Sequence, residues 1–337
     1  MEHKLWFMGT SYVPGEARTL IDNLEDSAHR EMACAEFYYF RGESEKAAEI
    51  SEKYLQDEDP VLRTLACLIY IFSDFSLGRV EAVKAGAHVM KVTADVLLRS
   101  EDRKERAYAA FAGSVARVLL HIEDWEAPLI FEYLTDLPKG LRLWGCYFIA
   151  YDAYQKGEYE RSRGIVETGL AFSPQLYPVS SIYLHLVAAM DAVSMKKMKE
   201  AGEHFLVAWG LAEPDGLLEG IGEHHGLLQG LVEQYIKEAS PEEFDRIFRI
   251  MERFSYGWQK WHGLESKGEG AKATDWKLSV LTQEEFAVAM LANRGWMNVE
   301  IAEHMGIEQN QLNRTLKAIY KKLGIANRRQ LKKYMLQ

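Results

Sequence analysis

Apolar residues recur every three or four positions along most of the chain, and few stretches alternate with a period of two. The first spacing gathers apolar side chains on one face of a helix, whereas the second is typical of half-buried strands. Only 8 of the 337 residues are prolines, so long helices are seldom interrupted. The pattern therefore predicts an all-α protein. The chain, with 337 residues, is long enough for two domains.

Residues 28 to about 260 are predicted to form pairs of helices. Two segments, Tyr39–Pro60 and Tyr154–Pro174, can be laid over each other. In each, a helix end is followed by a glycine turn, a second amphipathic helix and a terminating proline. The expected turns, including those of weaker copies, are at Gly42, at Gly78, near Glu123, at Gly157 and near Lys197. Their spacings of 36, 45, 34 and 40 residues are typical of stacked helical repeats, in which no unit buries its apolar face alone.

Two further helices are expected to close this region. One covers roughly Leu217–Lys237, and the next begins with a capping box at Ser240 followed by Pro241. An aromatic cluster ends the second of these helices: Phe254, Tyr256, Trp258 and Trp261. We interpret the cluster as core of a last repeat, because a stacking surface for bases would also need several interleaved basic residues. Residues 263–277 then combine glycines and charges without an apolar period, which predicts a linker.

The last sixty residues predict a compact domain of short helices. Thr282 and Glu285 form a capping box for the first helix, and Asn298 is expected to cap the second. Gly306 provides a tight turn before a third helix over about Gln309–Leu323. Apolar residues at positions 312, 316, 319, 320 and 323 lie on one face of this third helix. A short fourth helix is expected to carry Leu331, Tyr334 and Met335.

Charge divides the chain into two parts of opposite sign. Residues 278–337 hold 9 Lys and Arg against 5 Asp and Glu, a net charge of +4, whereas the remainder has a net charge of −14. On the third helix of the domain, Arg314, Lys317 and Lys321 recur at three and four residues and therefore project together. Such a face fits the major groove of duplex DNA, although a solvated charged helix in an ordinary bundle has the same pattern.

Three motifs follow one another in this domain: L-T-x-x-E, then G-x-x-N-x-E-I-A-x-x-x-G-I, then I-Y-x-K-L-G-I-x-N-R. Their order over Leu281–Leu331 resembles the C-terminal domain of LuxR/FixJ-type (GerE-like) transcription regulators. By this resemblance the helix-turn-helix is Asn298–Lys317, and the family's dimer helix corresponds to the helix with Leu331, Tyr334 and Met335. The residues assigned to DNA contact are Asn313, Arg314 and Lys317, together with Asn310, Gln311 and Lys321.

The helix pairs resemble tetratricopeptide repeats of the irregular kind found in the maltose-regulator group of bacterial activators. Together the two resemblances imply a tetratricopeptide-like helical-repeat solenoid over residues 1–262, the linker 263–277 and a four-helix LuxR-type domain over 278–337. The predicted function is a bacterial transcription regulator that binds duplex DNA as a homodimer. A ligand, peptide or protein in the groove of the repeat body is expected to control it.

The recognition helix departs from the usual family pattern at several positions, Gln311, Leu312 and Thr315 among them, and two further departures leave a second hypothesis open. Glu308 stands where the family has a capping Ser, and Asn313 stands where it commonly has Lys. Glu is a weaker N-cap than Ser, and its charge would lie near a phosphate. The alternative function is therefore an interaction scaffold whose helix-turn-helix has lost DNA binding.

Motifs for catalysis, cofactors and export are missing from the sequence. It contains no P-loop, HExxH, CxxC or GxSxG pattern, so neither an enzyme nor a cofactor or metal site is expected. The neighbouring His224 and His225 would point about 100° apart on a helix and could not easily chelate one ion. Neither a signal peptide nor an apolar run of about 20 residues is present, which predicts a cytoplasmic location away from membranes. Three widely spaced residues are expected to be buried free thiols: Cys34, Cys67 and Cys146.

Overall fold

The computed structural model describes residues 6–122, 125–173, 175–261, 281–293 and 295–333, and these residues form helices and loops without a strand. The all-α prediction is therefore confirmed. The chain divides into two compact units, Met1–Gly220 and Ile221–Gln337. The linker predicted over 263–277 lies outside the described residues. Within the described part of the chain, no helix combines the length and apolar content that crossing a membrane requires.

The first unit begins with a short 3₁₀ helix, η1 (Phe7–Gly9), and continues with six α-helices that each pack against the next. Their bounds are α1 (Ala17–Asp22), α2 (Ser27–Phe40), α3 (Ser44–Glu52), α4 (Pro60–Ser76), α5 (Val80–Leu98) and α6 (Arg103–Val118). Aspartates precede α2, α4 and α6: the side chains of Asp26, Asp59 and Asp102 accept hydrogen bonds from N–H groups of the first turn, at 3.0, 2.9 and 2.8 Å. Such a cap stabilises a helix by about 1 kcal/mol.

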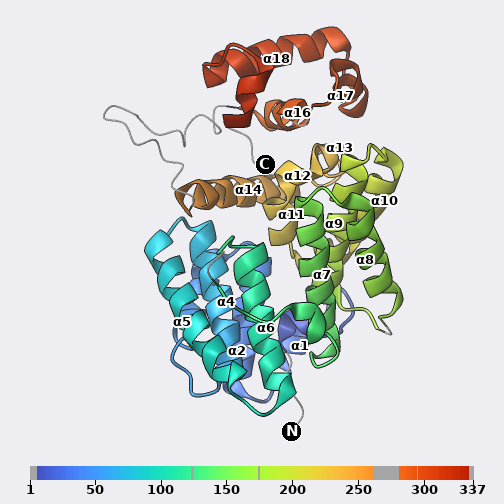
Figure 1. Ribbon diagram of the computed structural model, residues 1–337. Coiled ribbons are helices and arrows are strands. Elements are labelled where there is room, and N and C mark those ends of the chain that lie inside the picture. The colour runs from blue at the N-terminus through green and yellow to red at the C-terminus, as the bar shows by residue number, and fades with distance from the viewer. Residues whose placement is uncertain (1–5, 123–124, 174, 262–280, 294, 334–337) are drawn as a thin grey trace. The chain divides into compact units, whose positions relative to one another are not determined.

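Four further helices complete most of this unit, and Figure 1 shows them side by side in green. They are α7 (Lys139–Gln155), α8 (Tyr159–Ala171), α9 (Pro178–Ser194) and α10 (Met198–Ala212), followed by the 3₁₀ helix η3 (Glu213–Asp215). Each packs against its successor, and α7 also contacts α9, as α2 contacts α4. Neighbouring helical hairpins therefore stack on one another. That these hairpins form a tetratricopeptide solenoid stays a prediction.

The turns between paired helices follow the predicted positions at four of five places. Gly42, Gly78 and Gly157 have φ values of 80°, 67° and 77°, the left-handed conformation for which glycine has no steric penalty. The turn expected near Lys197 is also present, and its left-handed residue is Lys196, with φ 59°. The turn positions predicted for these four hairpins are therefore confirmed, including those of the weaker copies at Gly78 and near Lys197.

The helix pair predicted around Glu123 is wrong in its second half. Glu123 itself lies outside the described residues, and between α6 and α7 the described chain contains only the 3₁₀ helix η2 (Ile130–Glu132). Pro128 opposes a helix here, because it lacks an N–H and forces the preceding residue toward an extended conformation. The segment is instead fixed by buried side chains, Trp125 at 4% and Leu137 at 1% exposure.

Aromatic rings join helices that are distant in the sequence. Trp144 on α7 lies 4.7 Å, between ring centroids, from Tyr183 on α9, and Tyr183 contacts Phe40 on α2 at 6.0 Å. Phe111 on α6 meets Phe148 on α7 edge to face at 5.0 Å. Buried aromatic pairs of this kind add about 0.5–1.5 kcal/mol beyond the area they bury. The inner helices of the first unit thus share one core.

In the second unit, the single helix predicted over Leu217–Lys237 is wrong. The structure has three short helices, α11 (Glu219–Glu223) at the junction of the units, α12 (His225–Leu228) and α13 (Leu231–Tyr235). Gln229 and Gly230 have φ values of 50° and 95°, and two successive left-handed residues end a right-handed helix. Two buried side chains meet across the break, with His225 Nε2 at 2.9 Å from Glu233 Oε1.

The following helix, α14 (Pro241–Trp261), begins with proline at the predicted position. Its apolar face is buried through Phe244, Ile247, Ile250 and Met251. The aromatic cluster at its end, residues 254, 256, 258 and 261, is half-buried, so its interpretation as repeat core holds only in part. Lys260 Nζ lies 4.8 Å above the ring of Tyr256.

Candidate nucleic-acid interface

The last four helices of the second unit build the candidate interface. They are α16 (Gln283–Asn293), α17 (Asn298–His304), α18 (Gln309–Leu323) and the 3₁₀ helix η4 (Arg328–Lys333), and α16, α17 and α18 all contact one another. The inner face of α18 is at most 5% exposed and consists of Leu312, Leu316, Ile319 and Leu323. Burying each such side chain stabilises the domain by about 1.5–3 kcal/mol. The predicted bounds and the predicted core face of α18 are confirmed, with Tyr320 at its half-buried edge.

Local capping explains where these helices begin. The predicted box at the start of α16 is confirmed: Thr282 N–H donates to the Glu285 carboxylate at 2.6 Å, and Glu285 N–H donates to Thr282 Oγ1 at 3.2 Å. The prediction that Asn298 caps α17 is wrong, since Met297 precedes the helix and its N–H donates to the Glu300 carboxylate at 2.7 Å. Gly306 has φ 65° and makes the turn between α17 and α18.

All six predicted contact residues lie on the exposed side of α18. They are Asn310, Gln311, Asn313, Arg314, Lys317 and Lys321. Among the residues the structure describes, Arg314, Lys317 and Lys321 form no ion pair. The helix starts at Gln309 without a side-chain cap from Glu308, so the N–H groups of its first turn are open to an anion. This side of α18 combines amides near the start of the helix with cations along its length.

Asn298 has a different role from the predicted cap, because it orients a residue of the recognition helix. Its Nδ2 donates to Asn313 Oδ1 at 3.0 Å, and its Oδ1 accepts a hydrogen bond from Arg328 Nη1 at 3.3 Å. Arg328 also donates through Nε to the Ala292 carbonyl oxygen at 2.7 Å and through Nη2 to that of Trp296. Burial lowers the pKa of the Arg328 guanidinium, which still remains charged near neutral pH. Arg328 and Asn298 thus connect η4, α16 and α17 to the exposed face of α18.

Residue type and spacing alone could not separate Arg328 from the basic residues that face solvent. The motif I-x-N-R already contained it, and its fixed place in that motif was the available signal. Lys322 shows the same distinction on α18, because its Nζ lies 2.6 Å from Glu285 Oε2 of α16. Lys322 therefore joins two helices of the domain, whereas its neighbour Lys321 is exposed.

The predicted dimer helix is described only in part. Leu331 is 0% exposed and belongs to η4, which packs against α16, so its side chain is directed into its own domain. Tyr334 and Met335 lie outside the described residues. A dimer contact at this helix stays a prediction. The side chain of Leu331 is buried within its own domain and is therefore not available for such a contact.

The helix-turn-helix contacts the preceding helices of the second unit through α17. His304 Nε2 lies 2.8 Å from the Gln229 carbonyl oxygen, in the left-handed turn between α12 and α13. A Cβ atom on Gly230 would lie 2.8 Å from the same His304 nitrogen, so only glycine allows this approach. Burial lowers the pKa of His304, and the Gln229 carbonyl and Glu233 oppose this shift. Sequence reasoning missed this contact because its partner lies in a turn that was predicted to be helix.

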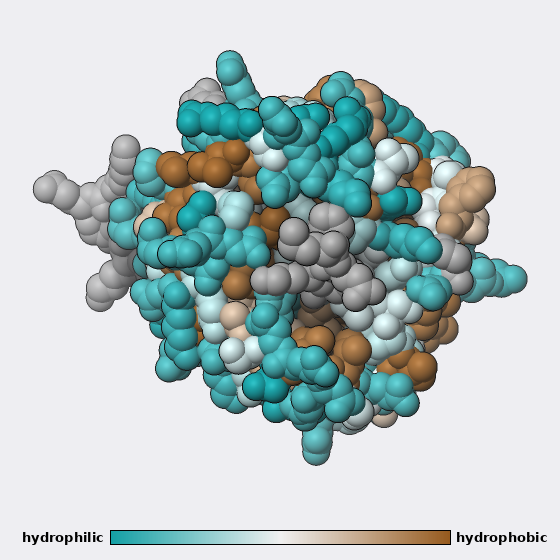
Figure 2. All heavy atoms as spheres, turned by 90° about the horizontal axis from the view of Figure 1, so that it is seen from below, coloured by the Kyte–Doolittle hydropathy of each residue, from teal (hydrophilic) through white to brown (hydrophobic). Residues whose placement is uncertain are grey.

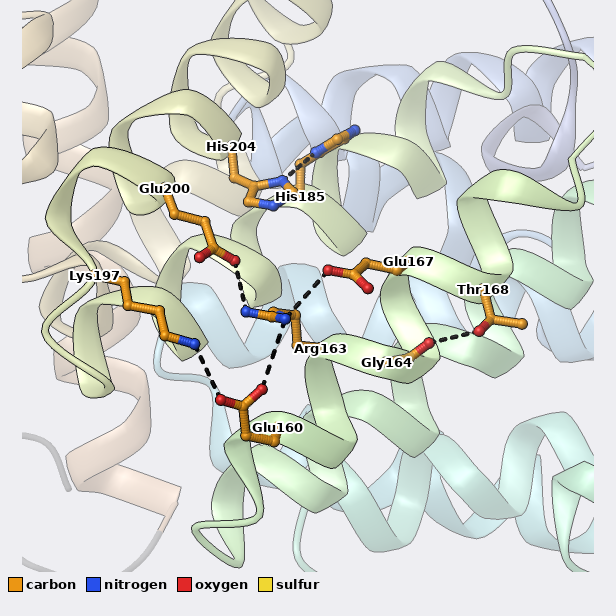
Figure 3. A network of polar contacts seen from close by, with 9 residues as sticks. All are labelled: Glu160, Arg163, Gly164, Glu167, Thr168, His185, Lys197, Glu200 and His204. Atoms are coloured by element: carbon orange, nitrogen blue, oxygen red, sulfur yellow. Dashed lines mark hydrogen bonds and ion pairs between the residues drawn. The ribbon is translucent and has the colours of Figure 1, made fainter.

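A second polar cluster lies in the first unit, between α8, α9 and α10, and is drawn in Figure 3. Arg163 is surrounded by the carboxylates of Glu160, Glu167 and Glu200, at 3.8, 3.2 and 3.0 Å. Beside it, His185 Nδ1 and His204 Nδ1 are 3.0 Å apart. Burial lowers the pKa of both imidazoles, that of His185 to about 4, so both are neutral at pH 7.

This cluster does not form a metal centre. Over the described residues, no group of three or more His, Cys, Asp or Glu side chains is placed to hold a metal ion. The three cysteines are free thiols, as predicted, but only Cys67 is buried, and Cys34 and Cys146 are half-buried. The face in Figure 2 is mainly hydrophilic, with hydrophobic patches between hydrophilic residues.

Arg314, Lys317 and Lys321 of α18 are exposed and form no ion pair with any described residue, so they remain the best-formed candidate site.

Residues 279–335 match the family described as bacterial regulatory proteins, luxR family. The match includes all of α16, α17, α18 and η4 and supports a DNA-binding transcription regulator. No curated protein and no solved structure matches the chain.

Proposed function

We propose that the chain regulates transcription by placing α18 in the major groove of duplex DNA. The observation that carries this proposal is the division of α18 into a buried apolar face and an exposed face with Asn313, Arg314 and Lys317. A helix of this kind can enter the major groove, where amide and guanidinium groups reach base edges. Lys317 and Lys321 are suited to phosphate contacts, which position the helix.

In this proposal the helix pairs of the first unit form a tetratricopeptide-like body that controls the DNA-binding domain through a bound effector. Its support is the repeated hairpin with a left-handed turn residue, at Gly42, Gly78, Gly157 and Lys196. The proposed active form is a homodimer, because two copies can bind two half-sites one helical turn apart.

The experiment is a fluorescence-anisotropy titration of the full chain with duplexes that tile the DNA upstream of its coding region. We expect Arg314→Ala/Lys317→Ala to weaken binding at least tenfold, since one bidentate base contact contributes about 1–3 kcal/mol. Lys317→Ala alone should reduce the slope of log K against log salt by about one unit, because it removes one phosphate contact. A matched control, Lys53→Ala/Lys199→Ala, removes the same charge from exposed sites of the first unit and should bind like the wild type.

The second candidate, an interaction scaffold, is favoured by the acidic residue Glu308 directly before α18 and by the engagement of Asn313 with Asn298. It predicts that the wild type and Arg314→Ala/Lys317→Ala bind every duplex equally weakly at low salt. That outcome would refute DNA recognition by α18.

A further inference from the structure

The N-terminal segment of the chain occupies the interior of the first unit. η1 packs against α2, α7 and α9, three helices that are far apart in the sequence. Trp6, Phe7 and Met8 are only 3%, 2% and 6% exposed. A segment outside every helix hairpin is therefore buried as deeply as the core.

The surrounding helices bind the main chain of this segment from both sides. The two carboxylate oxygens of Glu36 on α2 accept hydrogen bonds from the N–H groups of Phe7 and Met8, at 2.9 and 2.8 Å. Trp144 Nε1 on α7 donates to the carbonyl oxygen of Met8 at 2.9 Å. Main-chain hydrogen bonds combined with side-chain pockets are a usual means of binding a peptide.

Glu36 is an unusual residue for a site that serves packing alone. It is 0% exposed, and burial raises the pKa of its carboxyl to about 8, although the two backbone N–H donors oppose the shift. An apolar residue would avoid the cost of burying an ionisable group. Among the described residues, the hydrogen bonds that the Glu36 side chain accepts both come from N–H groups of the N-terminal segment. Its chemistry therefore suits recognition of a peptide backbone.

The shape of the site also selects its occupant. The Trp6 ring lies 5.2 Å from Tyr108 and 5.6 Å from Phe111, between centroids, so it occupies an aromatic pocket on α6. The close approach of the next turn requires glycine at position 140, because a Cβ there would collide with the carbonyl group of Gly9, and a Cβ on Gly9 would lie only 3.0 Å from the Leu141 side chain. The site thus accepts adjacent aromatic side chains followed by a residue without a side chain.

A separate contact holds the far end of the segment. Asp215 accepts hydrogen bonds from the N–H groups of Gly15 and Ala17 at 2.7 and 3.1 Å, and its own carbonyl accepts one from Arg41 at 2.9 Å. Between the two anchored ends, Val13 is 61% exposed and borders a surface hollow. Release of residues 6–9 from their pockets would therefore leave the Asp215 contacts of the segment in place.

We propose that Glu36, Trp144 and the pocket formed by Tyr108 and Phe111 are a peptide-binding groove, and that Trp6–Gly9 is its tethered internal ligand. The external ligand of this groove is a short peptide that adopts the same 3₁₀ turn as Phe7–Gly9, with two adjacent aromatic residues followed within two positions by glycine. The proposal is independent of DNA binding, since groove and occupant both belong to residues 1–220. A tethered ligand has an effective concentration in the millimolar range, so an external peptide competes poorly with it in the wild type.

The test uses a fluorescein-labelled peptide with the sequence of residues 3–16 and the full chain carrying Trp6→Ala/Phe7→Ala, which empties the pockets. We expect this variant to bind the peptide at least tenfold more tightly than the wild type does. Adding Glu36→Gln to the variant, or replacing Trp by Ala in the peptide, should abolish binding. Equal binding of the peptide to the variant and the wild type would overturn the proposal, as would no binding to a folded variant.

A second measurement on the wild type decides the matter if the variant does not fold. Hydrogen exchange of the Phe7 and Met8 amides is followed while the unlabelled peptide is added in excess. Displacement of the internal ligand should speed this exchange at least threefold, with no change in the core amides of α9. An unchanged exchange rate at saturating peptide means that the segment is simply part of the core.

Discussion

The basic residues of α18 and those of the α8–α10 cluster lie on similar helices but differ in what surrounds them. Arg163 has three carboxylates within 3.8 Å, and Lys197 Nζ lies 3.0 Å from Glu160. Arg314 and Lys317, in contrast, form no ion pair with any residue that the structure describes. Charges neutralised within the protein hold helices together, whereas charges left without a partner are available to an external polyanion.

The DNA-binding domain repeats this contrast on a smaller scale. Arg328 and Lys322 are directed to carbonyl oxygens and a carboxylate of their own domain, while Arg314 and Lys321 are exposed. Net charge alone therefore overstates the basic surface of the domain. Basic residues that bind groups of their own domain differ from exposed basic residues in whether the side chain has a partner. Substituting one residue of each kind tests this difference.

The largest effect is expected where a basic residue holds the domain together. Arg328→Ala removes hydrogen bonds to two backbone carbonyls and to Asn298. Because hydrogen bonds to charged groups contribute about 1.5–3 kcal/mol each and are not additive, we expect a loss of about 3 kcal/mol in the free energy of unfolding. Urea denaturation of the second unit, followed by the fluorescence of the buried Trp296, measures this loss.

Arg314→Ala is the matched control, since it removes the same charge from the exposed face of α18. Its free energy of unfolding should stay within about 0.5 kcal/mol of the wild type, as is usual for surface substitutions. Equal stability losses in the two variants would contradict the division into internal and external cations.

The sequence was informative wherever local rules decide the structure. The bounds of α18, its core face and the Thr282–Glu285 box depend on periodicity and capping, and all were predicted correctly. Contacts between distant segments could not be found in this way. The turn at Gln229 contacts His304, 75 residues further along the chain, and Met8 contacts Trp144, 136 residues further along the chain. Helix propensity and capping depend only on neighbouring residues, so they predict neither of these two contacts.

A smaller effect is expected from the histidine pair beside Arg163. Burial, with His204 as a second cause, lowers the pKa of His185 to about 4, from 6.5 in the unfolded chain. Between pH 4 and pH 6.5 the folded state therefore binds fewer protons than the unfolded state. The contribution of His185 to the free energy of unfolding is fully present above pH 6.5 and is lost as the pH falls toward 4. We expect His185→Gln to reduce the loss of stability between pH 7 and pH 4 by about 2 kcal/mol.

Thermal unfolding at several pH values measures this dependence. Glu36 and Asp191 contribute in the opposite direction, because burial raises the pKa of both carboxyls, to about 8 and about 7. The informative quantity is therefore the difference between the wild type and the variant at each pH, in which these contributions cancel. His88→Gln, at an exposed position of α5, should reproduce the wild-type curve. A constant difference between wild type and His185→Gln across the range would be evidence against a buried neutral imidazole.

The smallest effect on stability is expected for Arg163→Met, and it compares the two regions most directly. Each of its ion pairs is partly exposed, so their combined loss should destabilise the first unit by only about 1 kcal/mol, with the Met side chain keeping the aliphatic packing. Its affinity for DNA should equal that of the wild type. Arg314→Met should show the reverse, with unchanged stability and weaker DNA binding. Both variants lose one positive charge, so weakened DNA binding in both would mean that overall charge, and not the exposed face of α18, determines affinity.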